Sequence, residues 1–269
     1  MRLFVAGLHK LLRRPASLIS LALLIGLLAL IFLAVGATAR QTPAEQGGEA
    51  ALLLVTFPGA YTLIISFILG LGGLFAVIYG AAVAGSEWTW GTLKTAVARG
   101  ESRSRYQLAL FAAVALLIGI GLLISFGVGV GVALLGAMIA DVPTSGVSDP
   151  AALGTLPELL GRGWLAIAEE GAIGFAIATL ARSQLAGIGA GIGVYFAEQF
   201  ASIFLPDVIK YMPFNAAGAV VAVSDEGFGG GGGVLTQLQP NEALLVVFAW
   251  LVGSLLVTSL FTERAEISG

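Results

Sequence analysis

Long uncharged stretches alternate with short polar ones along this chain. No Asp, Glu, Lys or Arg occurs in residues 50–86 or in residues 106–140. Each stretch exceeds the roughly 20 apolar residues that a helix needs to cross a bilayer. The pattern predicts six membrane-spanning helices, over residues 16–39, 57–84, 107–140, 163–181, 184–205 and 243–262.

The third of these spans is too long for a simple crossing. Residues 106–140 form a run of 35 uncharged residues. As one helix the run would extend about 52 Å at 1.5 Å per residue, well beyond a hydrocarbon core of about 30 Å. We therefore expect this helix to tilt, to project from the membrane, or to break at a glycine. The candidate glycines are Gly119, Gly121, Gly127, Gly129 and Gly131.

The basic residues predict the topology. If both termini are cytoplasmic, ten of the 13 lysines and arginines lie inside: Arg2, Lys10, Arg13, Arg14, Lys94, Arg99, Arg103, Arg105, Arg182 and Arg264. The other three, Arg40, Arg162 and Lys210, lie outside. Because basic residues are enriched in cytoplasmic loops, this asymmetry favours both termini inside. The apolar run of residues 16–39 is longer than the roughly 7 to 15 residues of a signal-peptide core, so we expect it to be a retained first span.

Composition narrows the class further. The chain is 58% hydrophobic and 11% charged, whereas roughly a quarter of the residues in soluble domains are charged. We expect an all-α integral membrane protein with a single transmembrane domain, residues 1–269. The absence of cysteine excludes thiolate metal sites and cysteine nucleophiles. One histidine, His9, stands without partners near the N-terminus, so no metal site is expected.

The residues before the first span predict a short amphipathic helix over residues 1–15. Its apolar positions recur at helical spacing and alternate with basic residues, and Pro15 ends the pattern. They are Leu3, Phe4, Gly7, Leu8, Leu11 and Leu12. Such a helix lies in the inner interface with its basic side toward anionic head groups. It is either a simple positive-inside anchor or an elbow helix that also packs beside a cytoplasmic partner.

A polar, basic island over residues 86–105 separates the second and third predicted spans, and it has a helical pattern of its own. Trp90, Leu93 and Val97 fall at positions i, i+3 and i+7, which predicts an amphipathic helix capped by Glu87 or Thr89. Gly100 suits the C-terminus of that helix. Without further information, the island is equally a loop that rests on lipid head groups.

The same island carries a family resemblance. Glu87, followed by Gly91-Thr92-Leu93 and then by Ser102-Arg103 ahead of a span, resembles the E-x-x-x-G-T-L and S-R signature of the ABC type-2 permeases. These are the membrane subunits of ATP-binding-cassette exporters. The resemblance extends to the elbow helix, the six spans and the cytoplasmic termini, and it implies that the island is the coupling helix that docks on the ATPase subunit. The implied docking residues are Glu87, Trp88, Trp90, Gly91, Thr92, Leu93, Lys94, Arg99 and Arg103.

The resemblance also predicts partners and location. A G-x-x-x-x-G-K-[ST] phosphate loop is absent from the sequence, and the glycine run of residues 229–233 reads as a flexible outer loop. We therefore expect no cofactor on this chain, no catalysis by it, and ATP with Mg on a separate ATPase subunit. The expected partners are that ATPase, a second permease copy or a related permease, and membrane lipids, with no nucleic acid. The expected location is the plasma membrane of a prokaryote, and the expected cargo is lipophilic or amphipathic. The alternative is a scaffold or anchor subunit of a larger membrane complex that carries no cargo.

Three glutamates inside predicted spans are the second functional signal. Glu169 and Glu170 lie 13 and 12 residues before Arg182, and Glu198 lies 14 residues after Gln184, so all three reach a similar depth of about 18 to 21 Å. A charge at mid-bilayer costs at least about 2.5 to 3.5 kcal/mol, so such residues normally face an interior or a water-filled cavity. Either they line a transport path that favours cationic or zwitterionic cargo, or they are wetted from outside and pair with Arg162. No nucleophile or metal set accompanies them, which argues against an intramembrane enzyme.

Small residues and prolines complete the pattern. Gly187-x-x-x-Gly191 and Gly189-x-x-x-Gly193 overlap in the fifth span, and such spacings allow close contact between helices, within one chain or between copies. The outer connection over residues 206–242 begins with an apolar part interrupted by Pro206 and Pro213. It is expected to form broken helices that re-enter the membrane as an outer gate.

Overall fold

The computed structural model describes residues 2–38, 48–221 and 238–265. Every regular element in these residues is helical. Five helical stretches are long and apolar enough to cross a membrane, namely Ser17–Thr38, Gly59–Thr89, Arg103–Ile139, Pro150–Ala181 and Pro240–Arg264. The protein therefore has the construction of a multi-pass, all-helical membrane protein, as its sequence predicts.

The helix bounds match the predicted spans in most places. The first span is α2 (Pro15–Thr38), the fourth lies within α8 (Pro150–Ala181), and the last lies within α12 (Pro240–Arg264). The fifth predicted span is α9 (Gln184–Phe204), a helix of 21 residues. It is not one of the five stretches named above, and Gln184, Glu198 and Gln199 lower its mean hydropathy.

The second predicted span changes its winding part-way. It begins as α4 (Gly59–Phe67), passes through the π-helical segment η2 (Ile68–Gly72) and continues as α5 (Gly73–Thr89). Nothing in the hydrophobic pattern announces η2. A π segment leaves backbone carbonyls out of the regular α-helical ladder, and such segments are frequent at functional sites.

The third predicted span is one unbroken helix, α7 (Arg103–Ile139), of 37 residues. The expectation of a break at a glycine is therefore wrong. Two of the candidate glycines give room to neighbouring side chains instead: Ile64 packs on Gly129, and Trp164 packs on Gly119. The indole nitrogen of Trp164 also donates to the carbonyl of Ala115, at 2.9 Å, so a residue of α8 fastens the middle of α7.

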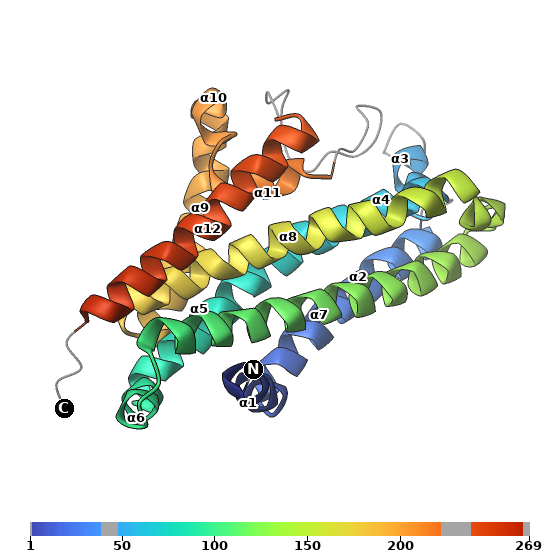
Figure 1. Ribbon diagram of the computed structural model, residues 1–269. Helices are drawn as coiled ribbons and strands as arrows, with labels where there is room; N and C mark the ends of the chain where they lie inside the picture. The colour runs from blue at the N-terminus through green and yellow to red at the C-terminus, as the bar shows by residue number, and fades with distance from the viewer. Residues whose placement is uncertain (1, 39–47, 222–237, 266–269) are drawn as a thin grey trace.

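The helices form a layered bundle around α5 and α8 (Figure 1). α5 and α8 pack along most of their shared length, α2 runs beside α7, α12 lies on α8, and α9 packs on α5. The α5–α8 contact is close because glycines face backbone: Gly80 meets the carbonyl of Gly171, and Gly174 meets the carbonyl of Val77. In lipid, such contacts between small residues are a main source of helix association.

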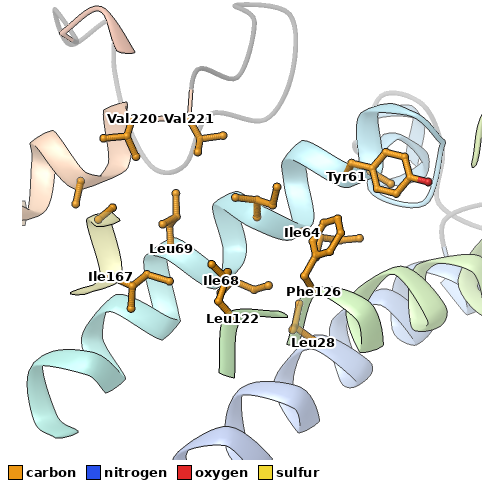
Figure 2. Packing of buried hydrophobic residues seen from close by; sticks show 14 of the residues in the cluster. Leu28, Tyr61, Ile64, Ile68, Leu69, Leu122, Phe126, Ile167, Val220 and Val221 are labelled. Atoms are coloured by element: carbon orange, nitrogen blue, oxygen red, sulfur yellow. The ribbon is translucent and has the colours of Figure 1, made fainter. Parts of the chain in front are cut away.

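The largest apolar cluster lies where α4 and η2 cross α7, and Figure 2 shows its centre. Ile64 and Ile68 are fully or almost fully buried and lie against Leu122 and Phe126 of α7. Leu28 of α2 closes the cluster from the other side. This cluster packs the π segment against its neighbours on several sides.

Short helices complete the described chain. The predicted elbow is α1 (Arg2–Leu12), which packs on α7 through Gly7, and Pro15 ends it by starting α2. The connection between α9 and α12 contains α10 (Pro206–Ile209) and α11 (Pro213–Ala219), each beginning at the predicted proline. The remaining short elements are α3 (Gly48–Leu53), η3 (Ser145–Ser148) and α6 (Thr92–Ala98). The glycine run at 229–233 and the rest of 222–237 lie outside the described residues.

Candidate functional site

The polar island of residues 86–105 folds as a compact turn between two long helices. α5 continues through Ser86 to Thr89, Gly91 reverses the chain with a left-handed φ of 66°, and α6 follows. Gly100 ends that turn with a φ of 86°, as its position predicts. A side chain at either glycine would be strained, because L residues rarely adopt positive φ.

The predicted caps of this helix are wrong. Glu87 and Thr89 belong to the last turn of α5, and the residue that precedes α6 is Gly91, which makes no side-chain capping bond. The prediction failed because α5 continues past the predicted span, which ends at residue 84, as far as Thr89. No new helix therefore starts at Glu87. The true side-chain cap in this region is Ser102, whose hydroxyl accepts from the backbone N–H of Arg105 at the start of α7.

Glu87 is the centre of a buried polar cluster. Its side chain is fully buried and joins three other elements. Lys10 of α1 lies 2.5 Å from one carboxylate oxygen, and Arg14 donates to the same oxygen at 3.5 Å. The other oxygen accepts from the hydroxyls of Thr92, at 2.5 Å, and Tyr106, at 2.6 Å.

The cluster gives a physical meaning to the motif. A carboxylate with opposite charges on one oxygen and hydroxyl donors on the other is well satisfied despite its burial. Because the donors come from α1, α6 and α7, Glu87 fixes the elbow helix and the island relative to each other. Thr92 is the threonine of the Gly-Thr-Leu sequence, so this contact lies within the motif.

A second set of contacts ties the island to the C-terminal part of the chain. The guanidinium of Arg103 donates to the carbonyls of Glu263, at 3.3 Å, and Ala265, at 2.6 Å. The Glu263 carboxylate accepts from the hydroxyl of Ser104 at 2.6 Å and from its backbone N–H at 3.1 Å. The start of α7 and the end of α12 are therefore joined.

Arg182 links α8 to the same region. It ends α8 with a left-handed φ of 51°, and its guanidinium lies 5.4 Å from the ring centre of Trp88 and 5.2 Å from that of Phe261. Trp88 and Phe261 also contact each other edge to face. A cation over the face of an aromatic ring is a favourable contact. These contacts pack the ends of α5, α8 and α12 against one another.

The exposed part of the island is small, aromatic and basic. Trp90 is 62% exposed and lies 5.0 Å under the guanidinium of Arg14. Lys94, Thr95, Ala98 and Arg99 are exposed on α6. This surface is suited to an acidic or apolar partner.

Leu93 does not belong to that surface. Its expected position in an apolar docking contact conflicts with the fold, because Leu93 is 1% exposed and packed inside its own chain. It supports α6 from within. The helical period puts Leu93 on the apolar side of α6, but it does not say whether that side faces a partner or the rest of the chain.

The three membrane glutamates are buried in the protein. Glu169, Glu170 and Glu198 are 0%, 3% and 6% exposed. The alternative in which they are wetted from outside and pair with Arg162 is wrong, because Arg162 pairs with Glu158 at 2.6 Å and donates to Asn241.

Their partners differ from one glutamate to the next. Glu198 accepts from the backbone N–H of Asn215, at 2.6 Å, and from its side-chain amide, at 3.0 Å. Both oxygens of Glu169 and one oxygen of Glu170 have no hydrogen-bond partner among the described residues. The Glu170 carboxylate occupies the space where a Cβ on Gly73 would lie.

Several residues of these two regions were not predicted from the sequence. The contacts of Lys10 and Arg14 with Glu87 span 77 and 73 positions. Lys10 lies on α1, and Arg14 lies beyond the end of that helix. Tyr195, whose hydroxyl donates to the carbonyl of Gly70 in η2 at 3.0 Å, reads from the sequence as one more apolar aromatic residue. The signal that could have found it is its i, i+3 spacing from Glu198, which places both residues on one face of α9.

Comparison with known proteins finds no family model and no curated relative that matches this chain. In the part of the chain that the structure describes, no group of three or more His, Asp or Glu side chains is placed to hold a metal ion. The features of the chain that bear on its function are therefore the motif, the contacts of the motif and the buried carboxylates.

Proposed function

We propose that this chain is the membrane-spanning permease subunit of an ABC exporter, located in a prokaryotic plasma membrane. In this proposal α9 is the fifth of six spans, and both termini face the cytoplasm. ATP and Mg are bound by a separate ATPase subunit, and a second permease copy or a related permease completes the path. The cargo is lipophilic or amphipathic.

The observation that carries the proposal is the Glu87 cluster. The glutamate and the threonine of the motif touch each other, and Lys10, Arg14 and Tyr106 complete their contacts. A loop that merely rested on head groups would not need a fully buried charge anchored to three helices. A loop that transmits force would, because displacement of α6 must reach the spans without being absorbed by local bending.

The contacts define a route for that movement. In the proposed cycle, closure of the ATPase dimer pushes on the exposed surface of the island at Trp90, Lys94 and Arg99. Glu87 passes the displacement to α1 and α7, Arg103 passes it to α12, and the short turn at Gly91 passes it directly to α5. α8 and α9 then move with α5, on which both pack.

The outer half of the proposed path involves the buried glutamates and the broken helices. α11 packs on α8, α9 and α12, and Asn215 binds Glu198 from it. In this proposal, α10 and α11 re-enter the membrane and form the described part of the outer gate that is predicted over residues 206–242. Movement of α9 would separate Glu198 from Asn215 and open the gate.

Co-purification and ATPase measurements test the proposal. The permease is expressed with any ATPase that is encoded beside it, and the complex is reconstituted in nanodiscs. We expect a stable complex whose ATPase is stimulated by cargo, and Trp90→Ala should weaken that complex about tenfold or more, since a buried interface tryptophan often contributes 2 kcal/mol or more. Trp250→Ala on α12 is the matched control, because Trp250 is also partly exposed but lies on another element.

Two results would contradict the proposal. If Trp90→Ala and Trp250→Ala bind the ATPase as tightly as the wild-type chain, α6 is not the docking helix. A stable complex that shows no ATPase response to any cargo would favour the alternative of a membrane scaffold that anchors a partner.

A further inference from the structure

The membrane carboxyl groups lie at a distinctive place in the fold. Tyr195 and Glu198 are three residues apart on α9, and Tyr195 donates to the carbonyl of Gly70 in η2. Glu170 of α8 lies against Gly73, at the junction of η2 and α5. The phenol of Tyr195 is also within electrostatic reach of Glu170 and Glu198. A polar layer therefore crosses the bundle where the second span changes its winding.

The layer carries acidic groups without matching bases. No lysine or arginine pairs with Glu169, Glu170 or Glu198 in the described part of the chain. From α9 it is faced by Tyr195 and Glu198, and from α11 by Asn215, which does not titrate. α5, η2, and the middle parts of α7 and α12 contribute no charged side chain to it. Three negative charges at this depth would be strongly unfavourable without compensation.

Glu169 is the buried carboxyl group of this layer that most needs a ligand. It is fully buried, and neither of its oxygens has a hydrogen-bond partner among the described residues. Buried polar groups in folded proteins are normally paired. A carboxyl group that is enclosed and unpaired requires a partner that is small enough to fit a closed site.

We propose that the layer of Glu169, Glu170 and Glu198 is a proton-binding site. The described carboxylates are not grouped so that they could hold a metal ion, whereas a proton needs only one carboxyl oxygen. Glu169 and Glu170 supply the charge, and the Glu198 carboxylate and the Tyr195 hydroxyl complete the polar surroundings. Loss of the Glu198–Asn215 contact would open this site toward α11.

This inference rests on the proposed function only where it places the layer on a transport path. Cation binding is a property of the permease alone, and it can be measured without an ATPase or a cargo. Failure to bind a cation would leave the exporter proposal standing, and failure of the exporter proposal would leave the cation site standing.

Thermal unfolding of the purified permease in nanodiscs is the main test. A ligand that binds the folded chain and not the unfolded chain raises the apparent Tm with its concentration. We expect the Tm of the wild-type chain to rise as pH falls. A rise with NaCl, but not with choline chloride, at fixed alkaline pH would show that the ligand is Na⁺ and would overturn the proton site.

Two variants assign the effect to the layer. Glu169→Gln together with Glu170→Gln should remove the cation-dependent shift, whereas Glu158→Gln should keep it, because Glu158 is an exposed glutamate on the same helix. Glu198→Gln, which retains an acceptor for Asn215, provides a second variant in case the double variant does not accumulate. Equal shifts in the wild-type chain and in whichever of these layer variants folds, or no shift in the wild-type chain, would overturn the proposal.

Labelling with the apolar reagent dicyclohexylcarbodiimide distinguishes the two ions. This reagent modifies protonated carboxyl groups within membranes, and mass spectrometry locates the product. A proton site predicts labelling of Glu169 or Glu170 that declines as pH rises, and a Na⁺ site predicts labelling that Na⁺ suppresses at constant pH. Labelling of these residues that neither pH nor Na⁺ changes would count against both ions.

Discussion

Glu87 and Glu169 are both fully buried glutamates, yet their surroundings are opposite. Glu87 has a lysine, an arginine and two hydroxyls around it. Glu169 has no hydrogen-bond partner among the described residues. The difference separates two uses of a buried carboxyl group. A group with permanent partners fixes helices together, and a group without them is available to a ligand that comes and goes.

The largest expected effect is in the topology, that is, in which side of the membrane each end of the bundle faces. Because the sequence has no cysteine, single cysteines at Ser102 and Ser148 report topology directly. We expect a membrane-impermeant maleimide to label Ser102→Cys only from the cytoplasm and Ser148→Cys only from outside. Labelling of both positions from the same side would contradict the predicted topology.

The next effect is loss of the permanent partners. Glu87→Ala leaves Lys10 and Arg14 without their carboxylate, and breaking a buried pair in this way costs about 3–5 kcal/mol. The lower end applies here, because Lys10 is partly exposed. We expect a lower apparent Tm in nanodiscs and weaker binding of the ATPase.

Glu101→Ala is the control for that change, because Glu101 is an exposed acid of the same loop. If both variants unfold at the wild-type temperature, the Glu87 cluster does not hold the inner end of the bundle.

Substitution of glutamate by glutamine should change the unfolding temperature in opposite directions in the two regions. Glu87→Gln removes a charge that has partners, so it should destabilise the chain. Glu169→Gln with Glu170→Gln removes charges that have none, so at alkaline pH, where a bound proton is lost, the double variant should unfold at the wild-type temperature or above it. The export rate or cargo preference should nevertheless change. A fall in Tm of similar size for both substitutions would show that the two regions are equivalent.

The smallest effect belongs to Glu198, which is intermediate between the two. Its hydrogen bonds to Asn215 hold the start of α11. Glu198→Ala should cost about 1–3 kcal/mol, since it leaves a buried donor without its acceptor. Glu198→Gln should cost much less, because the amide oxygen still accepts. Faster hydrogen exchange at Asn215 in the alanine variant alone would verify this, and unchanged exchange would contradict it.

Much of the helical framework could be predicted from the hydrophobic pattern. The first, fourth and last spans, α1, and the proline starts of α10 and α11 follow from runs of apolar residues and from Pro15, Pro206 and Pro213. These features depend on local composition, which can be read directly from the sequence. The continuous course of α7 could not be predicted, because whether Gly119 and Gly129 bend a helix or admit a neighbour depends on Trp164 and Ile64, which lie elsewhere in the sequence.

The candidate sites were predictable only in part. The motif identified Glu87 and Thr92, and the depth estimate identified the three membrane glutamates. Their surroundings depend on contacts between distant segments, such as Lys10 with Glu87, and on the π winding of η2. Burial of Leu93 could not be foreseen for the same reason, since an amphipathic period does not say what covers the apolar face.

The contact of Arg103 with the end of α12 also has a consequence for biosynthesis. The carbonyl of Glu263 that Arg103 binds is made 160 residues later, which at roughly 5–20 residues per second is a delay of about 8–32 s during translation. The contact set of Arg103 with Glu263 and Ala265 thus stays unfinished until Ala265 has been made. A partner that recognises this finished contact set would bind chains that include α12 in preference to chains that stop before it.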